Sequence, residues 1–394
     1  MPGIKTAKTG NEAIAEAMRQ IDPDVVAAYP ITPATEIVQI FSQFVADGKV
    51  HTEFVAVESE HSAMSATMGA CAAGARAMTA TSSQGLALMY EMLYIAAGLR
   101  LPIVMPEVNR TLSSPINIHG DHSDTMGARD AGWIQINCEN SQELYDSVLQ
   151  AVRIAEHADV RLPVIVNADG FIISHCMEVI EMLEDGVAKD YVGEYNPDRY
   201  LLDIKKPFTL GALDLQDYYF EHKMQEVDAM KRAGRVILEV GKDFGKKFGR
   251  EYGLYEKYKL DDAEIAILVM GSTAGTAKNV VDELRGGGVK AGLVKLRIYR
   301  PFPFKELAGE LAHLKALAVL DRADCVNGLG GQMFEETRSA LYESEKKPHI
   351  INYVYGLGGR DIDVGDIKKV YTTLQEVAST GKVIQRVDYI GLRE

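Results

Sequence analysis

Three side chains that could do chemistry each follow a predicted β-strand: the hydroxyl of Thr32, the carboxyl of Glu60 and the guanidinium of Arg110. A glutamate in an apolar pocket has a raised pKa and can share a proton with a ligand near neutral pH. A guanidinium presents a planar fork of N–H groups that binds a carboxylate through two hydrogen bonds. These residue types suit proton transfer and the recognition of a carboxylate.

Thr32 lies between two prolines in the segment Tyr29-Pro30-Ile31-Thr32-Pro33, at the end of the apolar run 25–29. Proline fixes φ and pushes the residue before it towards extended backbone. The hydroxyl is therefore presented from a stiff loop, and a helix is predicted to follow at about 35–46. A strand, a rigid loop and a helix in this order are where open α/β sheets bind ligands.

Each of these side chains also has a purely structural explanation. Glu60 could be a first-turn glutamate favoured by the helix dipole, with Ser59 as the N-cap. Arg110 could form an ordinary surface salt bridge, and Thr32 could bond to its own backbone in a turn. Glu58 is the alternative carboxyl in the same string, and we expect it to be exposed.

The elements that would position these side chains alternate between strand and helix. Apolar runs predict buried strands, and a 3.6-residue periodicity predicts helices between them. This alternation predicts parallel sheets that are covered on both faces. The first predicted strands lie at 25–29, 54–57, 77–80, 102–107 and 163–166, with helices at about 35–46, 63–75, 86–97 and 141–156. A second α/β unit begins at 261–262, with predicted strands at 265–270, 291–296, 316–320 and 350–354.

The segment from about 183 to 258 breaks this alternation. It is rich in Asp, Tyr and Lys, and its second half, roughly 215–247, predicts a polar helix. Disordered linkers are usually poor in aromatic residues, so the tyrosines and phenylalanines here favour a packed arm that joins two domains and reaches over a partner. We therefore expect one domain at 1–258, which includes this arm, and a second domain at 259–394.

Bulk properties narrow the class of protein. The 394 residues suit two or three domains. The net charge of −14 argues against a nucleic-acid partner, which needs a basic face. No stretch approaches the roughly 20 apolar residues of a membrane helix, and the first residues lack the apolar core of a signal peptide. We therefore expect no membrane partner and a cytoplasmic location.

The residues that bind metals in other proteins do not form a convincing site here. No CxxC pair is present, which argues against an iron–sulfur cluster held by this chain alone and against a zinc ribbon. His119 and His122, next to Asp121 and Asp124, have a spacing that also suits a polar active-site lid. We expect no metal site in this chain. The four cysteines are Cys71, Cys138, Cys176 and Cys325.

Five strings of residues carry a resemblance to a known family. Their order and spacing resemble the 2-oxoacid:ferredoxin oxidoreductases, and most closely the alpha subunit of the multi-subunit, pyruvate-oxidising members. The resemblance runs almost from end to end of the chain. The strings are Tyr29–Pro33 (YPITP), Glu58–His61 (ESEH), Thr79–Gly85 (TATSSQG), Asn109–Arg110 with Gly120–Asp124 (GDHSD), and Gly356–Asp361 (GLGGRD).

The resemblance implies a fold and a set of site residues. It implies a parallel-sheet domain of the type that binds the pyrimidine ring of thiamine diphosphate, followed by an α/β domain like the C-terminal domain of transketolase. Glu60 matches the glutamate that faces N1′ of the aminopyrimidine, and Thr32 and Arg110 match the pair that holds the substrate carboxylate. Further implied contacts are Tyr29, Pro30, Ile31, Gln84 and Gly85 for the cofactor and Ile118 for the substrate.

One motif of thiamine diphosphate enzymes is missing from this chain. These enzymes carry Gly-Asp-Gly and a later asparagine that hold Mg²⁺ and the diphosphate, whereas the nearest strings here are Ala168-Asp169-Gly170 and Gly120-Asp121-His122. The resemblance therefore implies a half-site, with thiamine diphosphate shared with a beta subunit that carries the diphosphate and Mg²⁺ site. Ferredoxin-like gamma and delta subunits would complete the complex. The [4Fe-4S] clusters would lie on partner subunits, and coenzyme A would dock on another subunit.

The implied activity is the reversible oxidative decarboxylation of pyruvate with coenzyme A to acetyl-CoA and CO₂, with reduction of ferredoxin. A branched-chain 2-oxoacid, 2-oxoisovalerate, is the alternative substrate, although Ser113–Asn117 looks more like the pyruvate pattern. A non-catalytic scaffold subunit is a further alternative, against which the joint presence of Glu60, Thr32 and Arg110 speaks. A nucleotide-binding protein is disfavoured because Gly271–Gly275 matches neither a P-loop nor a dinucleotide fingerprint.

Overall fold

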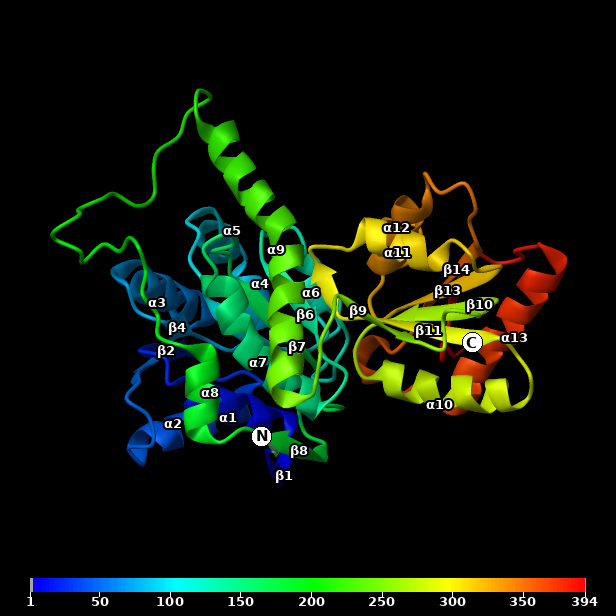
Figure 1. The fold of residues 1–394 in the computed structure, drawn as a ribbon, viewed down its shortest axis with the longest axis horizontal. Coiled ribbons are helices and arrows are strands. Elements are labelled where there is room, and N and C mark those ends of the chain that lie inside the picture. Colours follow the sequence, from blue (N-terminus) through cyan, green and yellow to red (C-terminus); the bar gives the residue numbers. More distant parts are fainter. Residues whose placement is uncertain (1–2, 394) are drawn as a thin grey trace.

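The computed structural model describes residues 3–393, which form two units built around separate β-sheets (Figure 1). The first unit contains a seven-stranded sheet and the second a six-stranded sheet. Most neighbouring strands in both sheets are parallel, and helices cover the faces. The α/β class expected from the alternation of apolar runs is what the chain adopts.

The first sheet has the strand order β12-β6-β7-β5-β4-β2-β3. Its inner strands β5 and β7 consist entirely of buried residues, as strands covered on both faces require. The strands are β2 (Val25–Ala28), β3 (Glu53–Ala56), β4 (Ala77–Met78), β5 (Val104–Asn109), β6 (Ile134–Asn137), β7 (Val164–Asp169) and β12 (Ile298–Arg300). Around them lie α1 (Gly10–Ile21), α2 (Thr35–Ala46), α3 (Glu60–Ala73), α4 (Gln84–Leu88), α5 (Tyr90–Gly98), α6 (Ser123–Gly127) and α7 (Ser141–Glu156).

Strand β6 and the end of strand β5 differ from the sequence-based expectation. Strand β6 was not predicted, because Gln135 and Asn137 interrupt its apolar character although both are buried. Strand β5 extends two residues beyond the predicted end at 107, so Asn109 also belongs to the strand and Arg110 follows it directly. The helices α2 and α7 have the predicted bounds of 35–46 and 141–156.

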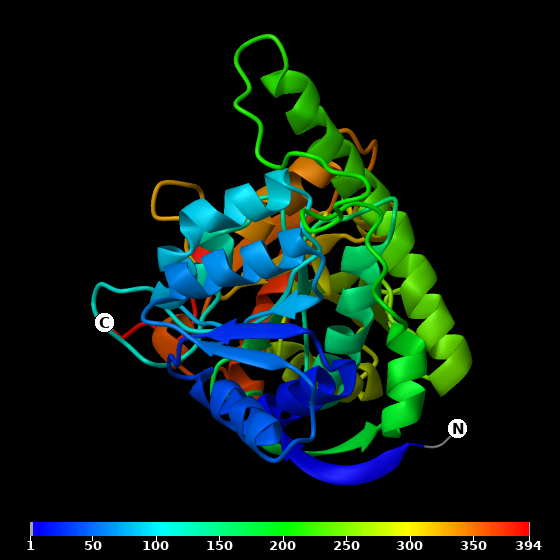
Figure 2. The same cartoon turned by 90° about the vertical axis from the view of Figure 1, so that its left-hand side faces the viewer.

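The segment 183–258 contains packed and projecting parts. Helix α8 (Asp185–Val192) packs against α1 and α7, and the long helix α9 (Tyr219–Phe248) buries an apolar stripe against α7. The loop before α9 and its first turns project from the body of the molecule (Figures 1 and 2, green). Their large apolar side chains are exposed, so the packed arm expected from the aromatic content is only partly observed. Within residues 3–393, no helix has both the length and the apolar character needed to cross a bilayer.

The second sheet has the order β15-β14-β13-β10-β11-β9. Strand β9 is the first strand of this sheet along the chain, and it lies just before the expected domain boundary at 258–259. Strand β12 lies after that boundary, but it pairs with β6 of the first sheet. The division into two domains at that boundary stays a prediction.

The strands of the second sheet are β9 (Tyr255–Tyr258), β10 (Ile265–Val269), β11 (Ala291–Leu296), β13 (Ala316–Asp321), β14 (His349–Val354) and β15 (Val387–Tyr389). The helices are α10 (Thr273–Gly286), α11 (Phe304–Leu311), α12 (Gln332–Leu341), the short η1 (Leu357–Gly359) and α13 (Val364–Thr380), and a separate two-stranded sheet pairs β1 (Ile4–Thr9) with β8 (Met177–Met182).

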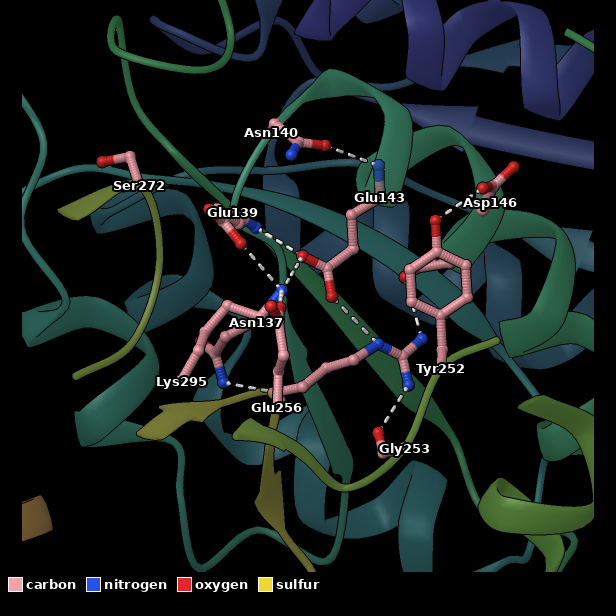
Figure 3. A network of polar contacts seen from close by, with 12 residues as sticks. Asn137, Glu139, Asn140, Glu143, Asp146, Tyr252, Gly253, Glu256, Ser272 and Lys295 are labelled. Carbon is pink, nitrogen blue, oxygen red and sulfur yellow. Dashed lines mark hydrogen bonds and ion pairs between the residues drawn. The ribbon is translucent and has the colours of Figure 1, made fainter. Parts of the chain in front are cut away.

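A buried ionic network joins the two units (Figure 3). Lys295 of β11 contacts three carboxylates, with Nζ–O distances of 2.9 Å to Glu139, 3.0 Å to Glu143 and 3.1 Å to Glu256. Burial alone would lower the pKa of Lys295, but these carboxylates outweigh it and raise the pKa. Arg297 contacts Glu143 at 3.2 Å. Because Glu139 and Glu143 belong to the first unit, the network fixes the second unit against the start of α7.

Candidate active site

Arg110 lies at the carboxyl end of β5 and is 8% exposed. Its Nη1 donates to the main-chain oxygen of Thr32 at 3.0 Å, and its Nε donates to the main-chain oxygen of Asn117 at 2.8 Å. No hydrogen bond within residues 3–393 uses Nη2. The edge formed by Nη1 and Nη2 therefore keeps N–H groups for a carboxylate, which is the geometry of bidentate binding.

The loop that carries Thr32 leaves β2 and is fastened from behind. The side-chain amide of Asn11, which is fully buried, donates to the main-chain oxygen of Pro33 at 2.9 Å. The Thr32 side chain is exposed, and its hydroxyl makes no hydrogen bond with another part of the described chain. The alternative explanation of Thr32 as a turn hydroxyl bonded to its own backbone is therefore not observed. Tyr29 and Pro30 are exposed beside it, and Ile31 is half-buried.

Glu60 is the first residue of α3 and is 6% exposed. Ser59 caps the helix, with its hydroxyl accepting from the main-chain N–H of Ser62 at 3.2 Å. No hydrogen bond from any described residue reaches the Glu60 carboxyl. The rival carboxyl Glu58 is exposed, as expected, and accepts from the hydroxyl of Ser62.

The lack of a side chain at Gly85 leaves the space that the Glu60 carboxyl occupies. A Cβ at Gly85 would lie 2.8 Å from Glu60 Oε1 and 2.4 Å from Thr81 Oγ1. Real Cβ atoms do not approach other atoms so closely, so only glycine allows Glu60 and Thr81 to lie against this turn. Gln84 precedes it, and its amide oxygen accepts from the hydroxyl of Ser83 at 2.7 Å.

Asp124 connects the two halves of the site. One of its oxygens, Oδ2, accepts from the main-chain N–H of Ser83 at 3.2 Å and from that of Arg110 at 2.8 Å. The turn beside Glu60 and the start of the Arg110 loop are thus tied to one carboxyl. The sequence contained a weak signal for this residue, since Asp124 closes the GDHSD string, but the spacing there suggested a lid or a metal site rather than a tie between two loops.

The second unit holds the loop that follows Arg110. The side-chain amide of Asn117 donates to the main-chain oxygen of Gly358 at 2.9 Å, and the Gly358 N–H donates to Asp121 Oδ2 at 3.0 Å. Gly358 and Gly359 have φ values of 62° and 80°, in the left-handed region that favours glycine. No local sequence signal indicates the contact between Asn117 and Gly358, which spans 241 positions of sequence.

A buried charge cluster lies behind the same loop. Asp169 at the end of β7 contacts His122 Nε2 at 2.6 Å and Arg322 Nη1 at 3.0 Å, and it accepts from the main-chain N–H of Ser272 at 2.9 Å. Burial alone would raise the pKa of Asp169, but His122 and Arg322 outweigh it and hold the pKa below its usual range. The Nε2 atom of His122 is thus hydrogen-bonded to Asp169. His119 instead packs its ring against Phe171, with 5.1 Å between ring centroids.

Ile118, the remaining predicted site residue, is on the loop between Arg110 and Asp121 and is half exposed. Its contact with a substrate stays a prediction. A cavity of about 940 Å³ lies between α9, the loop 300–304 and α12, and none of the predicted site residues lines it. Among residues 3–393, no group of three or more His, Cys, Asp or Glu side chains is arranged to hold a metal ion.

Sequence comparison places this chain in a known family. Residues 16–242 match the family described as pyruvate flavodoxin/ferredoxin oxidoreductase, thiamine diphosphate-binding, and residues 263–367 match the pyruvate:ferredoxin oxidoreductase core domain II. The pyruvate synthase subunit PorA of Thermotoga maritima is 55% identical over 391 residues, which are 99% of this chain and 98% of that protein. The PorA subunit of Pyrococcus abyssi is 45% identical over 99% of both chains. The ketoisovalerate oxidoreductase subunit VorA of Pyrococcus abyssi is 42% identical over 99% of this chain and 98% of its own.

Solved structures share the fold. The 2-oxoglutarate:ferredoxin oxidoreductase from Magnetococcus marinus aligns with a TM-score of 0.74 at 19% identity, over 95% of this chain and 65% of that longer chain. A split gene transketolase aligns with a TM-score of 0.56 at 12% identity, over 94% of this chain and 99% of its own. The expected fold class is thus confirmed. With both family matches and an identity that extends from end to end, the chain belongs to the pyruvate:ferredoxin oxidoreductase family.

Proposed function

We propose that this chain is the subunit of a thiamine-diphosphate-dependent pyruvate:ferredoxin oxidoreductase that contributes Glu60 to the cofactor and Arg110 with Thr32 to the 2-oxoacid. The complex converts pyruvate and coenzyme A to acetyl-CoA and CO₂ and passes the electrons to ferredoxin, in a reversible reaction. The observation that carries the proposal is the convergence of these three side chains, from three different strand ends, at one edge of the first sheet.

The residues present fit the aminopyrimidine end of thiamine diphosphate. A largely buried carboxyl gains from a hydrogen-bond donor that a ligand supplies, and Glu60 is 6% exposed with no donor to its carboxyl among residues 3–393. A ring N–H of the cofactor would satisfy it, and Tyr29, Pro30, Ile31 and the Gln84–Gly85 turn would line the ring. When bound, the cofactor supplies a nucleophilic carbon and stabilises the negative charge left when CO₂ departs. The role of Glu60 is to hold and release the proton at the ring nitrogen.

Arg110 and Thr32 would bind the carboxylate of the substrate. The Nη1–Nη2 edge of Arg110 provides two parallel N–H groups, and the exposed hydroxyl of Thr32 provides one further donor. This carboxylate is the group that leaves as CO₂, so both residues orient the bond that breaks.

The complex would complete the site with other subunits. The relatives at 55% and 45% identity are themselves named as subunits, so we infer that this chain acts within a complex. A beta subunit would hold the diphosphate and Mg²⁺, gamma and delta subunits would accompany it, and the partners would carry the [4Fe-4S] clusters and the coenzyme A site. Calorimetry of the isolated chain with thiamine diphosphate and Mg²⁺ tests the half-site: weak binding is expected, and tight binding would contradict it.

The substrate is tested with the purified complex. Reduction of ferredoxin should be faster with pyruvate than with 2-oxoisovalerate or 2-oxoglutarate at equal concentrations. A preference for 2-oxoisovalerate would favour the branched-chain alternative, which the relative at 42% identity represents. Activity with none of these acids in an intact complex would support a scaffold role instead.

A further inference from the structure

Two buried carboxyl groups lie between the cofactor side and the substrate side of this site. Glu107 in β5 is 0% exposed and Asp124 in α6 is 3% exposed. Both accept a hydrogen bond from the same main-chain N–H, that of Ser83, at 3.1 Å to Glu107 Oε1 and 3.2 Å to Asp124 Oδ2. The two carboxyl groups are therefore immediate neighbours in the protein interior.

The surroundings do not allow both groups to be charged. Two like charges in one buried site raise each other's pKa until one group is neutral. The guanidinium of Arg110 is directed to Thr32 and Asn117 rather than to this pair. A third carboxyl that acts on Asp124, that of Asp121, is acidic as well, and the sheet neighbour of Glu107 on β7 is the uncharged Asn167. One of the two carboxyls must hold a proton.

Hydrogen bonding assigns this proton to Glu107. Asp124 accepts from four N–H groups, those of Ser83, Arg110 and Thr125 in the main chain and that of the Asn109 side chain, whereas Glu107 accepts from one. Donors stabilise the charged form of a carboxyl. Burial raises the pKa of Glu107 well above its usual range, and Asp124 adds to this effect. The second oxygen of Glu107, Oε2, is buried and accepts no hydrogen bond from a described residue, so no donor stabilises a negative charge on it.

The pair supports both halves of the site. Ser83 has a φ of 50°, which is rare for a residue with a side chain, and its N–H is held by the two carboxyls. Thr81 pairs with Glu107 between neighbouring strands, so the two side chains lie on the same face of the sheet. The hydroxyl of Thr81 and the carboxyl of Glu60 both lie against Gly85. The line of contacts therefore runs from Glu60 through this turn to the main chain of Arg110.

We propose that Glu107 is a positioning residue of this site: it keeps its proton, donates it in a hydrogen bond to Asp124, and thereby fixes the Ser83–Gly85 turn relative to Arg110. The proposal rests on the function proposed above, because it gives Glu107 the task of supporting Glu60 and Arg110. Its chemical core is the protonation state of a single carboxyl, which can be measured without turnover.

Infrared spectroscopy of the full chain, without cofactor or substrate, measures that state. At neutral pH, E107Q should remove a carbonyl band of a protonated carboxylic acid from the spectrum. The control E58Q removes an exposed carboxyl close to the same site and should leave that band unchanged. If E107Q removes only carboxylate absorption, Glu107 is charged and the proposal is wrong.

Kinetics of the assembled complex measure the positioning. E107A should lower kcat/KM for pyruvate by about 10- to 100-fold, the loss typical of a displaced reacting group. E107Q should stay close to the unmodified complex, because its amide can donate to Asp124 and accept from Ser83. As the pH rises through the pKa of Glu107, the unmodified complex should lose activity that E107Q retains, since an amide does not titrate.

Two kinetic results would overturn the proposal. The first is full activity of the E107A complex. The second is an equally large loss of activity in E107A and E107Q, provided that circular dichroism shows E107Q to be folded. An unmodified complex that is inactive with pyruvate would instead contradict the proposed function. The infrared result would still decide whether Glu107 carries the proton.

Discussion

The guanidinium of Arg110 donates from Nη1 to the main-chain oxygen of Thr32 at 3.0 Å, across 78 positions of sequence. The bond fixes the arginine against the loop whose hydroxyl would share its ligand. It uses one N–H of Nη1 and leaves the outer edge of the guanidinium for a carboxylate. The proposed substrate side of the site therefore consists of two loops that are held together by this hydrogen bond. The effects expected from replacing Arg110 and Thr32 differ in size.

Replacing Arg110 by alanine should raise KM for pyruvate strongly while KM for coenzyme A changes little. Losing one partner of a desolvated charge pair costs about 2–5 kcal/mol, because the carboxylate is left unpaired. R110K should recover only part of the loss, since an ammonium group lacks the planar fork. Steady-state kinetics of the complex check this, with R338A at an exposed arginine of α12 as the control. Unchanged pyruvate kinetics in R110A would make Arg110 a structural residue.

Replacing Thr32 by valine should weaken pyruvate binding more mildly. The change keeps the shape of the side chain and removes one neutral hydrogen bond, which is worth about 0.5–1.5 kcal/mol. T32S keeps the hydroxyl and should behave nearly like the unmodified protein. The comparison of KM values among T32V, T32S and R110A checks the order. A larger effect of T32V than of R110A would reverse the assigned roles.

Replacing Gly85 by alanine should displace Glu60. The added methyl would lie 2.8 Å from Glu60 Oε1 and 2.4 Å from Thr81 Oγ1, and overpacking of this kind costs about 1–3 kcal/mol. The isolated chain should therefore lose thermal stability and the complex should lose activity. The matched control is G309A, in α11, where a Cβ meets no atom within 4 Å. Because alanine favours helix over glycine, G309A should be neutral or stabilising, and a G85A chain as stable and active as G309A would refute the close contact.

Replacing Asn117 by aspartate tests the contribution of the second unit. The change keeps the side-chain oxygen that accepts from the main-chain N–H of His119 at 2.8 Å, but it removes the amide that donates to Gly358. The loop should loosen and Arg110 should lose the fixed position of its acceptor, the Asn117 carbonyl. KM for pyruvate should rise, by less than in R110A, and kcat/KM for coenzyme A should be retained. An N117D complex with unaltered pyruvate kinetics would show that the contact between the units does not reach the site.

The sequence predicted those parts of this site that are local. The prolines around Thr32, the cap before Glu60 and the strand before Arg110 are each encoded within a few residues, and family resemblance added their roles. The order of the strands is not local: β2 and β5 are separated by β4 in the sheet, and no periodicity indicates that. The approach of Arg110 to Thr32 could therefore be predicted only through the resemblance.

The supporting residues could not be predicted for two further reasons. The contact of Asn117 with Gly358 spans 241 positions and involves a main-chain group, which leaves no trace in residue type. Glu107 lies inside a buried strand, where a carboxyl contradicts the pattern that defines the strand. Strand β6 was missed for the same reason, since its buried Gln135 and Asn137 read as polar interruptions.

The central claim is that Glu60 acts on thiamine diphosphate, and hydrogen–deuterium exchange at C2 of the cofactor in the assembled complex tests it most directly. Removing a positioned acid–base group typically costs about 10²-fold or more, so E60Q should slow the exchange by at least this factor while the complex stays assembled. E58Q, two residues away and exposed, should exchange like the unmodified complex. An unchanged exchange rate in E60Q, or a slowed rate in E58Q alone, would contradict the account.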